Sequence, residues 1–128
     1  MDGRVVSIIT ESFWPILKAG LQYTIPLTLI SFALGTFIAV IVAVIRISKV
    51  KGLDLICRFY VWVIRGTPLL VQLFVVFFGL PRVGIIIKPI PAGILVFSLS
   101  VGAYSSEIFR AAIQSIPKGQ WEASSSLG

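Results

Sequence analysis

The chain has 128 residues, of which 57% are hydrophobic and 12% are charged, and its mean hydropathy is +1.02. A soluble domain usually carries about 25% charged residues because its surface faces water, so this composition excludes a soluble globular protein and predicts an all-α integral membrane helical bundle. The formal net charge is +6, yet the basic residues stand at the ends of apolar runs, so we expect no nucleic-acid partner.

The small number of reactive side chains excludes further classes of function. Cys57 is the single cysteine and the sequence has no histidine. An intramolecular disulfide, a zinc site of nitrogen and sulfur ligands, and a Ser-His-Asp or Cys-His nucleophile are therefore excluded. The sequence also has no Gly-x-x-x-x-Gly-Lys-Ser/Thr phosphate loop. We expect no enzyme, no metal and no cofactor in this chain, and uphill transport would need energy from another polypeptide.

Residues 1–18 are predicted to form an interfacial helix. Their large apolar side chains fall roughly on one helical face, as in helices that lie in the membrane surface. These side chains belong to Val5, Val6, Ile9, Phe13, Ile16 and Leu17. A cleaved signal peptide is rejected, because the next apolar run exceeds the about 7–15 residues of such peptides and begins only after Asp2 and Glu11.

The first membrane span is predicted at 20–45, within the longest uncharged stretch of the chain. About 20 helical residues are enough to cross a hydrocarbon core of about 30 Å. Gly35, Ala39 and Ala43 recur every four residues, a spacing that lets a neighbouring helix approach closely. The alternative is that these small residues are simply tolerated on a helix that faces lipid.

Two more spans are predicted, at 59–80 and 89–107. Pro68 lacks a backbone N–H, so a kink is expected within the second span. Arg65 lies near the same point, and its long side chain can reach back to the water. The third span is rich in small residues, which favours packing against protein over packing against lipid. They are Ser98, Ser100, Gly102 and Ala103.

The basic residues also predict how the chain is oriented. Four of them lie in the connection 46–58, directly after the first span, namely Arg46, Lys49, Lys51 and Arg58. Lysine and arginine are enriched in cytoplasmic loops. We therefore expect this connection and the C-terminus in the cytoplasm, and the N-terminus outside.

Polar residues inside spans are costly in lipid, so each is a candidate for function. Glu107 could instead pair with Arg110, because residues three apart share a helical face. Arg65 could instead be a helix-end anchor. The candidates for a translocation path or for helix packing are Arg65, Thr67, Pro68, Gln72 and Glu107.

The segment 116–128 is predicted to begin a short helix, since Pro117 is tolerated in a first helical turn. This helix would place Trp121 close to small serine residues, with Glu122 beside them. Such a surface would suit a cytoplasmic protein partner. The alternative is an ordinary helix next to the membrane.

Three sequence blocks, in order, carry a family resemblance that extends over roughly 15–128. The run Glu122-Ala-Ser-Ser-Ser-Leu-Gly128 resembles the first half of the EAA loop of ABC importer permeases, with Ser124 in place of the second alanine. The runs Arg65-Gly-Thr-Pro-Leu-Leu-Val-Gln72 and Ala103-Tyr-Ser-Ser-Glu-Ile-Phe-Arg110 resemble the polar amino-acid subfamily. The chain thus resembles the permease subunit of a polar amino-acid ABC importer.

The resemblance implies a multi-pass protein of the bacterial inner membrane that moves amino acids. It implies a second permease copy or sister permease, two cytoplasmic ATPase subunits that bind the ATP, and an extracytoplasmic solute-binding protein. The family's EAA loop forms a coupling helix on the ATPase. The residues that match it or its lead-in are Pro117, Gly119, Glu122, Ala123, Ser124 and Gly128.

The family pattern continues beyond the EAA block into further spans, so we expect a C-terminally truncated permease. The alternative is a small structural or regulatory membrane protein with three spans and no transport activity, or an inactive permease fragment.

Overall fold

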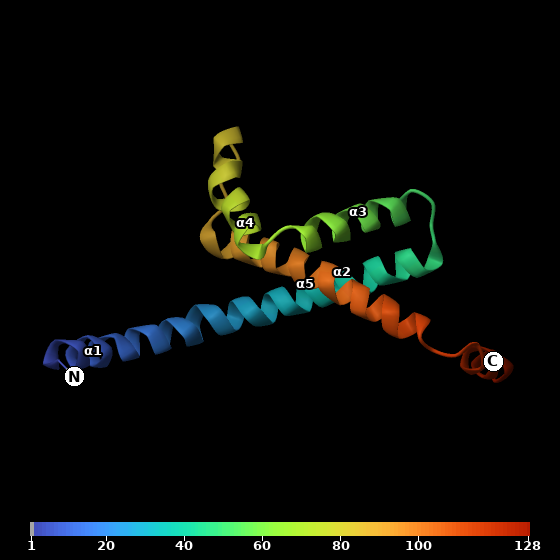
Figure 1. Ribbon diagram of the computed structural model, residues 1–128, viewed down its shortest axis with the longest axis horizontal. Helices are drawn as coiled ribbons and strands as arrows, with labels where there is room; N and C mark the ends of the chain where they lie inside the picture. Colours follow the sequence, from blue (N-terminus) through green and yellow to red (C-terminus); the bar gives the residue numbers. More distant parts are fainter. Residues whose placement is uncertain (1) are drawn as a thin grey trace.

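The computed structural model describes residues 2–128, and the regular structure in this range is helical throughout (Figure 1). The predicted all-α class is therefore confirmed. The elements are α1 (Gly3–Ala19), the π-helix η1 (Gly20–Thr24), α2 (Ile25–Ser48), α3 (Leu53–Gly66), α4 (Leu69–Phe74), the π-helix η2 (Val75–Gly79), the 3-10 helix η3 (Leu80–Val83), α5 (Pro89–Gln114) and α6 (Lys118–Ser126).

Helices α1, η1 and α2 form one continuous helix of 46 residues, Gly3–Ser48, which runs along the length of the molecule (Figure 1). At 1.5 Å per residue this is about 70 Å, far more than the about 30 Å of a hydrocarbon core. The wide π-turn of η1 lies just before Pro26, whose ring would clash with a carbonyl of the preceding α-helical turn. The helix therefore passes this proline without ending.

The predicted interfacial helix at 1–18 corresponds to α1, except for Met1, which lies outside the described residues. Asp2 caps the helix by accepting a hydrogen bond from the backbone N–H of Arg4 at 3.4 Å. None of the residues of α1 is buried. Its placement in the membrane surface stays a prediction.

Close packing of α2 against α5 forms the centre of the fold, and it depends on small residues. Gly35, Ala39 and Ala43 of α2 are all buried, which confirms the predicted helix contact at this spacing. A Cβ atom added to Gly35 would lie 2.5 Å from the Cβ of Val101 and 3.0 Å from the carbonyl oxygen of Ser98. The backbones of the two helices therefore approach as closely as small residues allow in membrane bundles.

Helix α3 lies beside the second half of α2 and completes the core (Figure 1). The buried cluster consists of Val42, Cys57, Val61 and Ala103, one or more from each of the three helices. Cys57 is buried and acts as a small apolar residue of this core. The hydroxyl of Tyr60 donates a hydrogen bond to the carbonyl of Leu99, which ties α3 to α5.

The predicted second span, 59–80, is broken in the structure. Helix α3 begins earlier, at Leu53, and ends at Gly66, and the helical segment that follows Pro68 is bent by 103° from it. Thr67 is extended, with φ −115° and ψ 128°, because the ring of a proline disfavours a helical conformation in the residue before it. The proline thus produces the expected kink, but as a sharp change of direction.

The third helix, α5, begins at Pro89 as predicted and continues seven residues beyond 107, to Gln114. Its small residues Ser98, Gly102 and Ala103 are buried against other helices, as the composition of this run predicts. The helices long and apolar enough to cross a membrane are the continuous Gly3–Ser48 helix and α5, and the bent α3–α4 pair would make a third. Three spans therefore stay a prediction.

Candidate functional site

Glu107 is the centre of an ion-pair cluster that joins three helices. It pairs with Arg46 at the end of α2, with Arg110 one turn later on α5, where Nη2 and Oε2 are 2.8 Å apart, and with Arg65 at the end of α3 at 3.9 Å. The carboxylate side chain is 20% exposed. We call these four residues the Glu107 cluster. One carboxylate here neutralises part of the charge of three arginines.

The sequence predicts one ion pair of the Glu107 cluster but not the others. The predicted pair of Glu107 and Arg110 is confirmed. The partner on α2, Arg46, is 61 residues away, and its sequence context predicts only a charge that flanks the membrane. The sequence did offer one indication of this pair. Glu107 is an acidic residue at the end of the third apolar run, and a charged group there is expected to pair with a basic residue at the same membrane edge.

Arg65 contributes to this site in two ways. Its guanidinium lies 5.8 Å from the centre of the Tyr104 ring, in cation–π contact, and its side chain remains 50% exposed. It also lines a cavity of about 710 Å³ together with Trp62, Tyr104 and Glu107. The structure therefore makes Arg65 a link between α3 and α5, consistent with an anchor at a helix end. A role in a translocation path stays a prediction.

Gln72, Thr67 and Pro68 hold the bend between α3 and α4. The amide nitrogen of Gln72 donates to the carbonyls of Ile64 and Thr67, both at 3.0 Å, and the Thr67 hydroxyl donates to the carbonyl of Val63 at 2.7 Å. The carbonyls of Val63 and Ile64 belong to the last turn of α3, where helical carbonyls lack the usual backbone donors four residues on; Ile64 accepts in addition from the backbone N–H of Thr67 at 3.4 Å. Gln72 and Thr67 thus supply side-chain donors at the helix end that Pro68 interrupts.

Helix α6 lies apart from the bundle, at the C-terminal end of the chain (Figure 1). Pro117 precedes its first residue, and the extended backbone of this proline, with ψ 144°, separates α6 from α5. No residue of α6 is buried, and within residues 2–128 it packs against none of the other helices. Its surface is therefore exposed within the described part of the chain.

The predicted coupling residues all lie on or next to this helix. Gly119, Glu122, Ala123 and Ser124 are on α6 itself, and Gly128 follows it with φ +97°. The carboxylate of Glu122 lies 3.9 Å from the Lys118 ammonium, in an exposed pair that contributes little to stability. The structure brings these residues onto one short exposed element and keeps them apart from the Glu107 cluster.

The described part of the chain, residues 2–128, contains no group of three or more Cys, Asp or Glu residues that could hold a metal ion. Helix α6 presents exposed polar and small side chains, and the Glu107 cluster consists of three guanidinium groups around one carboxylate.

Comparison with known proteins agrees with this arrangement. Residues 35–128 match the family described as binding-protein-dependent transport system inner membrane component. The chain is 52% identical over 121 residues to the L-cystine transport system permease protein TcyB of Bacillus subtilis (strain 168), covering 94% of this chain and 52% of that protein. It is 39% identical over 115 residues to the arginine transport system permease protein ArtQ of the same organism, covering 89% and 52%.

A solved structure is similar as well. The crystal structure of an amino acid ABC transporter with histidines has a TM-score of 0.84 and 36% identity, covering all of this chain and 59% of the solved one. The chain spans about half the length of the curated relatives it matches. These relatives do not favour a small structural or regulatory membrane protein. The matched family covers most of the sequence, including α6, and the chain belongs to the binding-protein-dependent transport system inner membrane component family.

Proposed function

We propose that this chain acts in the permease subunit of an ABC importer for polar amino acids, and that α6 is the helix through which an ATPase drives it. The observation that carries the proposal is the exposed helix α6, which bears the EAA-like residues and packs on no other helix within residues 2–128. A helix with small side chains such as Ala123 and Ser124 can fit closely into a groove of a partner protein.

The proposal includes the partners of the permease. Two cytoplasmic ATPase subunits bind and hydrolyse ATP, an extracytoplasmic binding protein delivers the amino acid, and a second permease copy or a sister permease completes the pathway. The relatives are transport permeases, which supports a chain with no catalytic activity of its own. The cofactor ATP then belongs to the ATPase subunits alone.

The proposed orientation places the N-terminus outside and the C-terminus in the cytoplasm, in a bacterial inner membrane. It is supported by the basic residues that surround the connection between α2 and α3 and by Arg110 at the same end of the bundle. In this orientation α6 lies on the side of the membrane where ATP is available. The Glu107 cluster, which joins α2, α3 and α5, would then carry movement of α6 and α5 into the spans.

The test uses the assembled transporter and compares two substitutions on the same exposed helix. Glu122→Ala removes a residue of the EAA block, whereas Gln120→Ala removes an exposed side chain outside it. We expect Glu122→Ala to lower ATP-dependent amino-acid uptake at least about tenfold, about 1.4 kcal/mol in coupling free energy, at unchanged permease level in the membrane. The Gln120→Ala transporter should retain uptake. Full uptake in Glu122→Ala would refute the coupling role of α6.

A further inference from the structure

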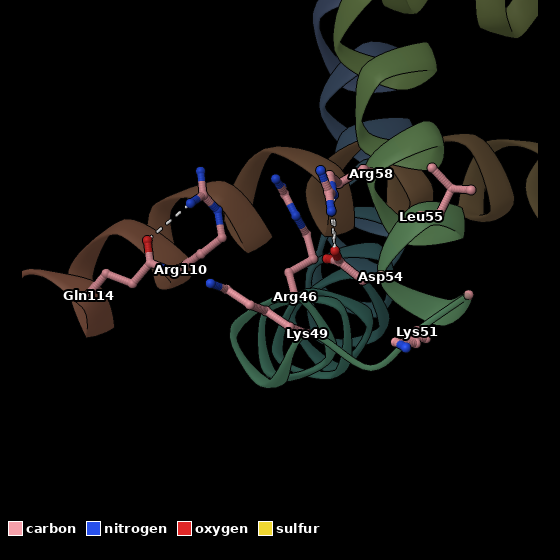
Figure 2. Close-up of a pocket in the computed structure, with 9 residues that line it drawn as sticks. Arg46, Lys49, Lys51, Asp54, Leu55, Arg58, Arg110 and Gln114 are labelled. Carbon is pink, nitrogen blue, oxygen red and sulfur yellow. Dashed lines mark hydrogen bonds and ion pairs between the residues drawn. The ribbon is translucent and has the colours of Figure 1, made fainter.

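A cavity of about 620 Å³ opens between the end of α2, the start of α3 and the last turns of α5 (Figure 2). We call it the basic cavity. Its charged lining consists of Arg46, Lys49, Lys51, Arg58, Arg110 and one acidic residue, Asp54. Such a local excess of positive charge attracts an anion.

Both acidic groups near the basic cavity, Asp54 and Glu107, already accept hydrogen bonds from arginines of the chain. Asp54 accepts a hydrogen bond from Nε of Arg58 at 3.1 Å, and Figure 2 shows the two side chains facing each other. Glu107 accepts hydrogen bonds from both Arg46 and Arg110. The single carboxylate of Glu107 therefore pairs with two arginines that line the cavity, so the cavity keeps a net positive charge.

Several donors in the basic cavity have no partner within residues 2–128. Lys49 and Lys51 take part in none of the ion pairs of this part of the chain. The Nε atom of Arg110 is buried and donates no hydrogen bond. Figure 2 shows Lys49 and Arg46 at the end of α2 beside Arg110 of α5. A phosphate group, with several acceptor oxygens, would satisfy donors arranged in this way.

A second cavity, of about 710 Å³, adjoins the basic one, and the two share Arg46, Leu55 and Arg58. Its remaining charged lining is Arg65 and Glu107, which pair with each other. The rest of its wall is mostly aromatic and apolar and includes Phe59, Val61, Trp62 and Tyr104. Leu55 is 69% exposed and Trp62 is 73% exposed. A ligand that fills both cavities would need an anionic part and an apolar part.

We propose that the two cavities bind an anionic phospholipid, with its phosphate among Arg46, Lys49 and Arg110 and its apolar part along Leu55 and Trp62. The basic cavity lies at the end of the apolar 24-residue helix α2, where the basic residues of the connection 46–58 predict a membrane edge and therefore lipid headgroups. Basic residues at that level attract anionic lipids, at about 1 kcal/mol each. The site recognises the membrane, so it does not depend on which solute the permease moves.

The experiment titrates the full chain in neutral detergent with phosphatidylglycerol or phosphatidylcholine and counts bound lipid by native mass spectrometry. The variant Lys49→Gln/Lys51→Gln removes two exposed charges that support no ion pair, and we expect it to bind phosphatidylglycerol roughly 10- to 30-fold more weakly. The matched control Arg82→Gln/Lys88→Gln removes two exposed charges in the segment before α5. It should bind phosphatidylglycerol like the unchanged chain.

Four results would overturn the proposal. Equal affinity for the two lipids would show that the headgroup charge is not recognised, and equal losses in both double variants would show a general charge effect. Displacement of phosphatidylglycerol by an equal concentration of inorganic phosphate would indicate a site for a free anion. Loss of the ATPase subunit from an assembled transporter carrying Lys49→Gln/Lys51→Gln, with lipid binding retained, would indicate an acidic protein surface as the occupant.

Discussion

The bundle of α2, α3 and α5 differs from the separate helix α6 in how far its small residues are buried. In the bundle, small residues such as Gly35 and Ala103 are buried at helix contacts, and the Glu107 cluster connects all three helices. Helix α6 also carries small residues, Gly119 and Ala123 to Ser126, but none of them is buried. The same residue types are therefore packed between helices in one region and exposed in the other, within residues 2–128.

The largest effect on the bundle is expected from Gly35→Ala. The added Cβ would meet Val101 at 2.5 Å, closer than two carbon atoms can approach, so α2 and α5 must move apart. We expect a loss of about 3 kcal/mol in the free energy of unfolding. The measurement is unfolding of the purified protein in mixed micelles with increasing sodium dodecyl sulfate.

The control for this substitution is Gly20→Ala. A Cβ added to Gly20 meets nothing within 4 Å, and alanine favours a helix over glycine by about 1 kcal/mol. Its stability should stay equal or rise. Equal losses at the two glycines would show that α2 and α5 are not in close contact.

A smaller loss is expected from Glu107→Gln. The substitution keeps the size of the side chain but leaves Arg46, whose side chain is 14% exposed, without its carboxylate. Removing one partner of a fully buried pair costs about 3–5 kcal/mol, and with water near both groups we expect about 1–3 kcal/mol. The same unfolding assay measures it, with the exposed Glu11→Gln on α1 as the control.

A double-mutant cycle with Arg46→Gln would isolate the interaction between the two side chains. If Glu107→Gln and Arg46→Gln have additive effects, the pair does not contribute to the connection between α2 and α5.

Gln72→Ala tests the bend between α3 and α4. The substitution removes two hydrogen bonds to carbonyls at the end of α3, so we expect a loss of about 1 kcal/mol. The effect should be local, with a broader distribution of distances between spin labels on α3 and α4. Gln22→Ala, at an exposed position of η1, should leave that distribution narrow. An unchanged distribution in Gln72→Ala would mean that Pro68 alone fixes the bend.

The smallest effect on stability is expected from Trp121→Ala in α6. Truncation of a buried tryptophan usually costs about 3–5 kcal/mol, but Trp121 is 52% exposed and its helix packs on none of the others in residues 2–128. We expect an unfolding curve that overlays that of the unchanged chain. A clear loss of stability would mean that α6 packs against the bundle, and would contradict the statement that α6 is separate from it.

Sequence reasoning succeeded where a feature depends on neighbours along the chain. The spacing of Gly35, Ala39 and Ala43 predicts the contact of α2, and the three-residue separation of Glu107 and Arg110 predicts their pair. Pro68 predicts the position of the bend but not its size, 103°, nor the hydrogen bonds from Gln72 across it.

Features that depend on distant segments could not be obtained in the same way. The partner of Glu107 on α2, Arg46, is fixed by how the helices pack, and their packing is not encoded in local spacing. The continuity of α1 and α2 was also missed, because polar residues and Pro26 suggest a break that the π-turn of η1 avoids. For α6, the helix could be predicted and the coupling role of its residues stays a prediction, whereas its separation from the bundle is visible only in the structure.

The most direct test of the account is a crosslink from α6 to the ATPase subunit. Cys57 is replaced by alanine, and a single cysteine is introduced at Ala123 on α6 or, as a control, at Ser7 on α1. Each transporter is assembled in membranes, labelled at the cysteine with a short maleimide–diazirine crosslinker and irradiated, so that the carbene inserts into any protein bond within reach. The account predicts a covalent permease–ATPase adduct from position 123 and none from position 7. Failure of position 123 to form this adduct in an assembled, transporting complex would contradict the central claim that α6 is the coupling helix.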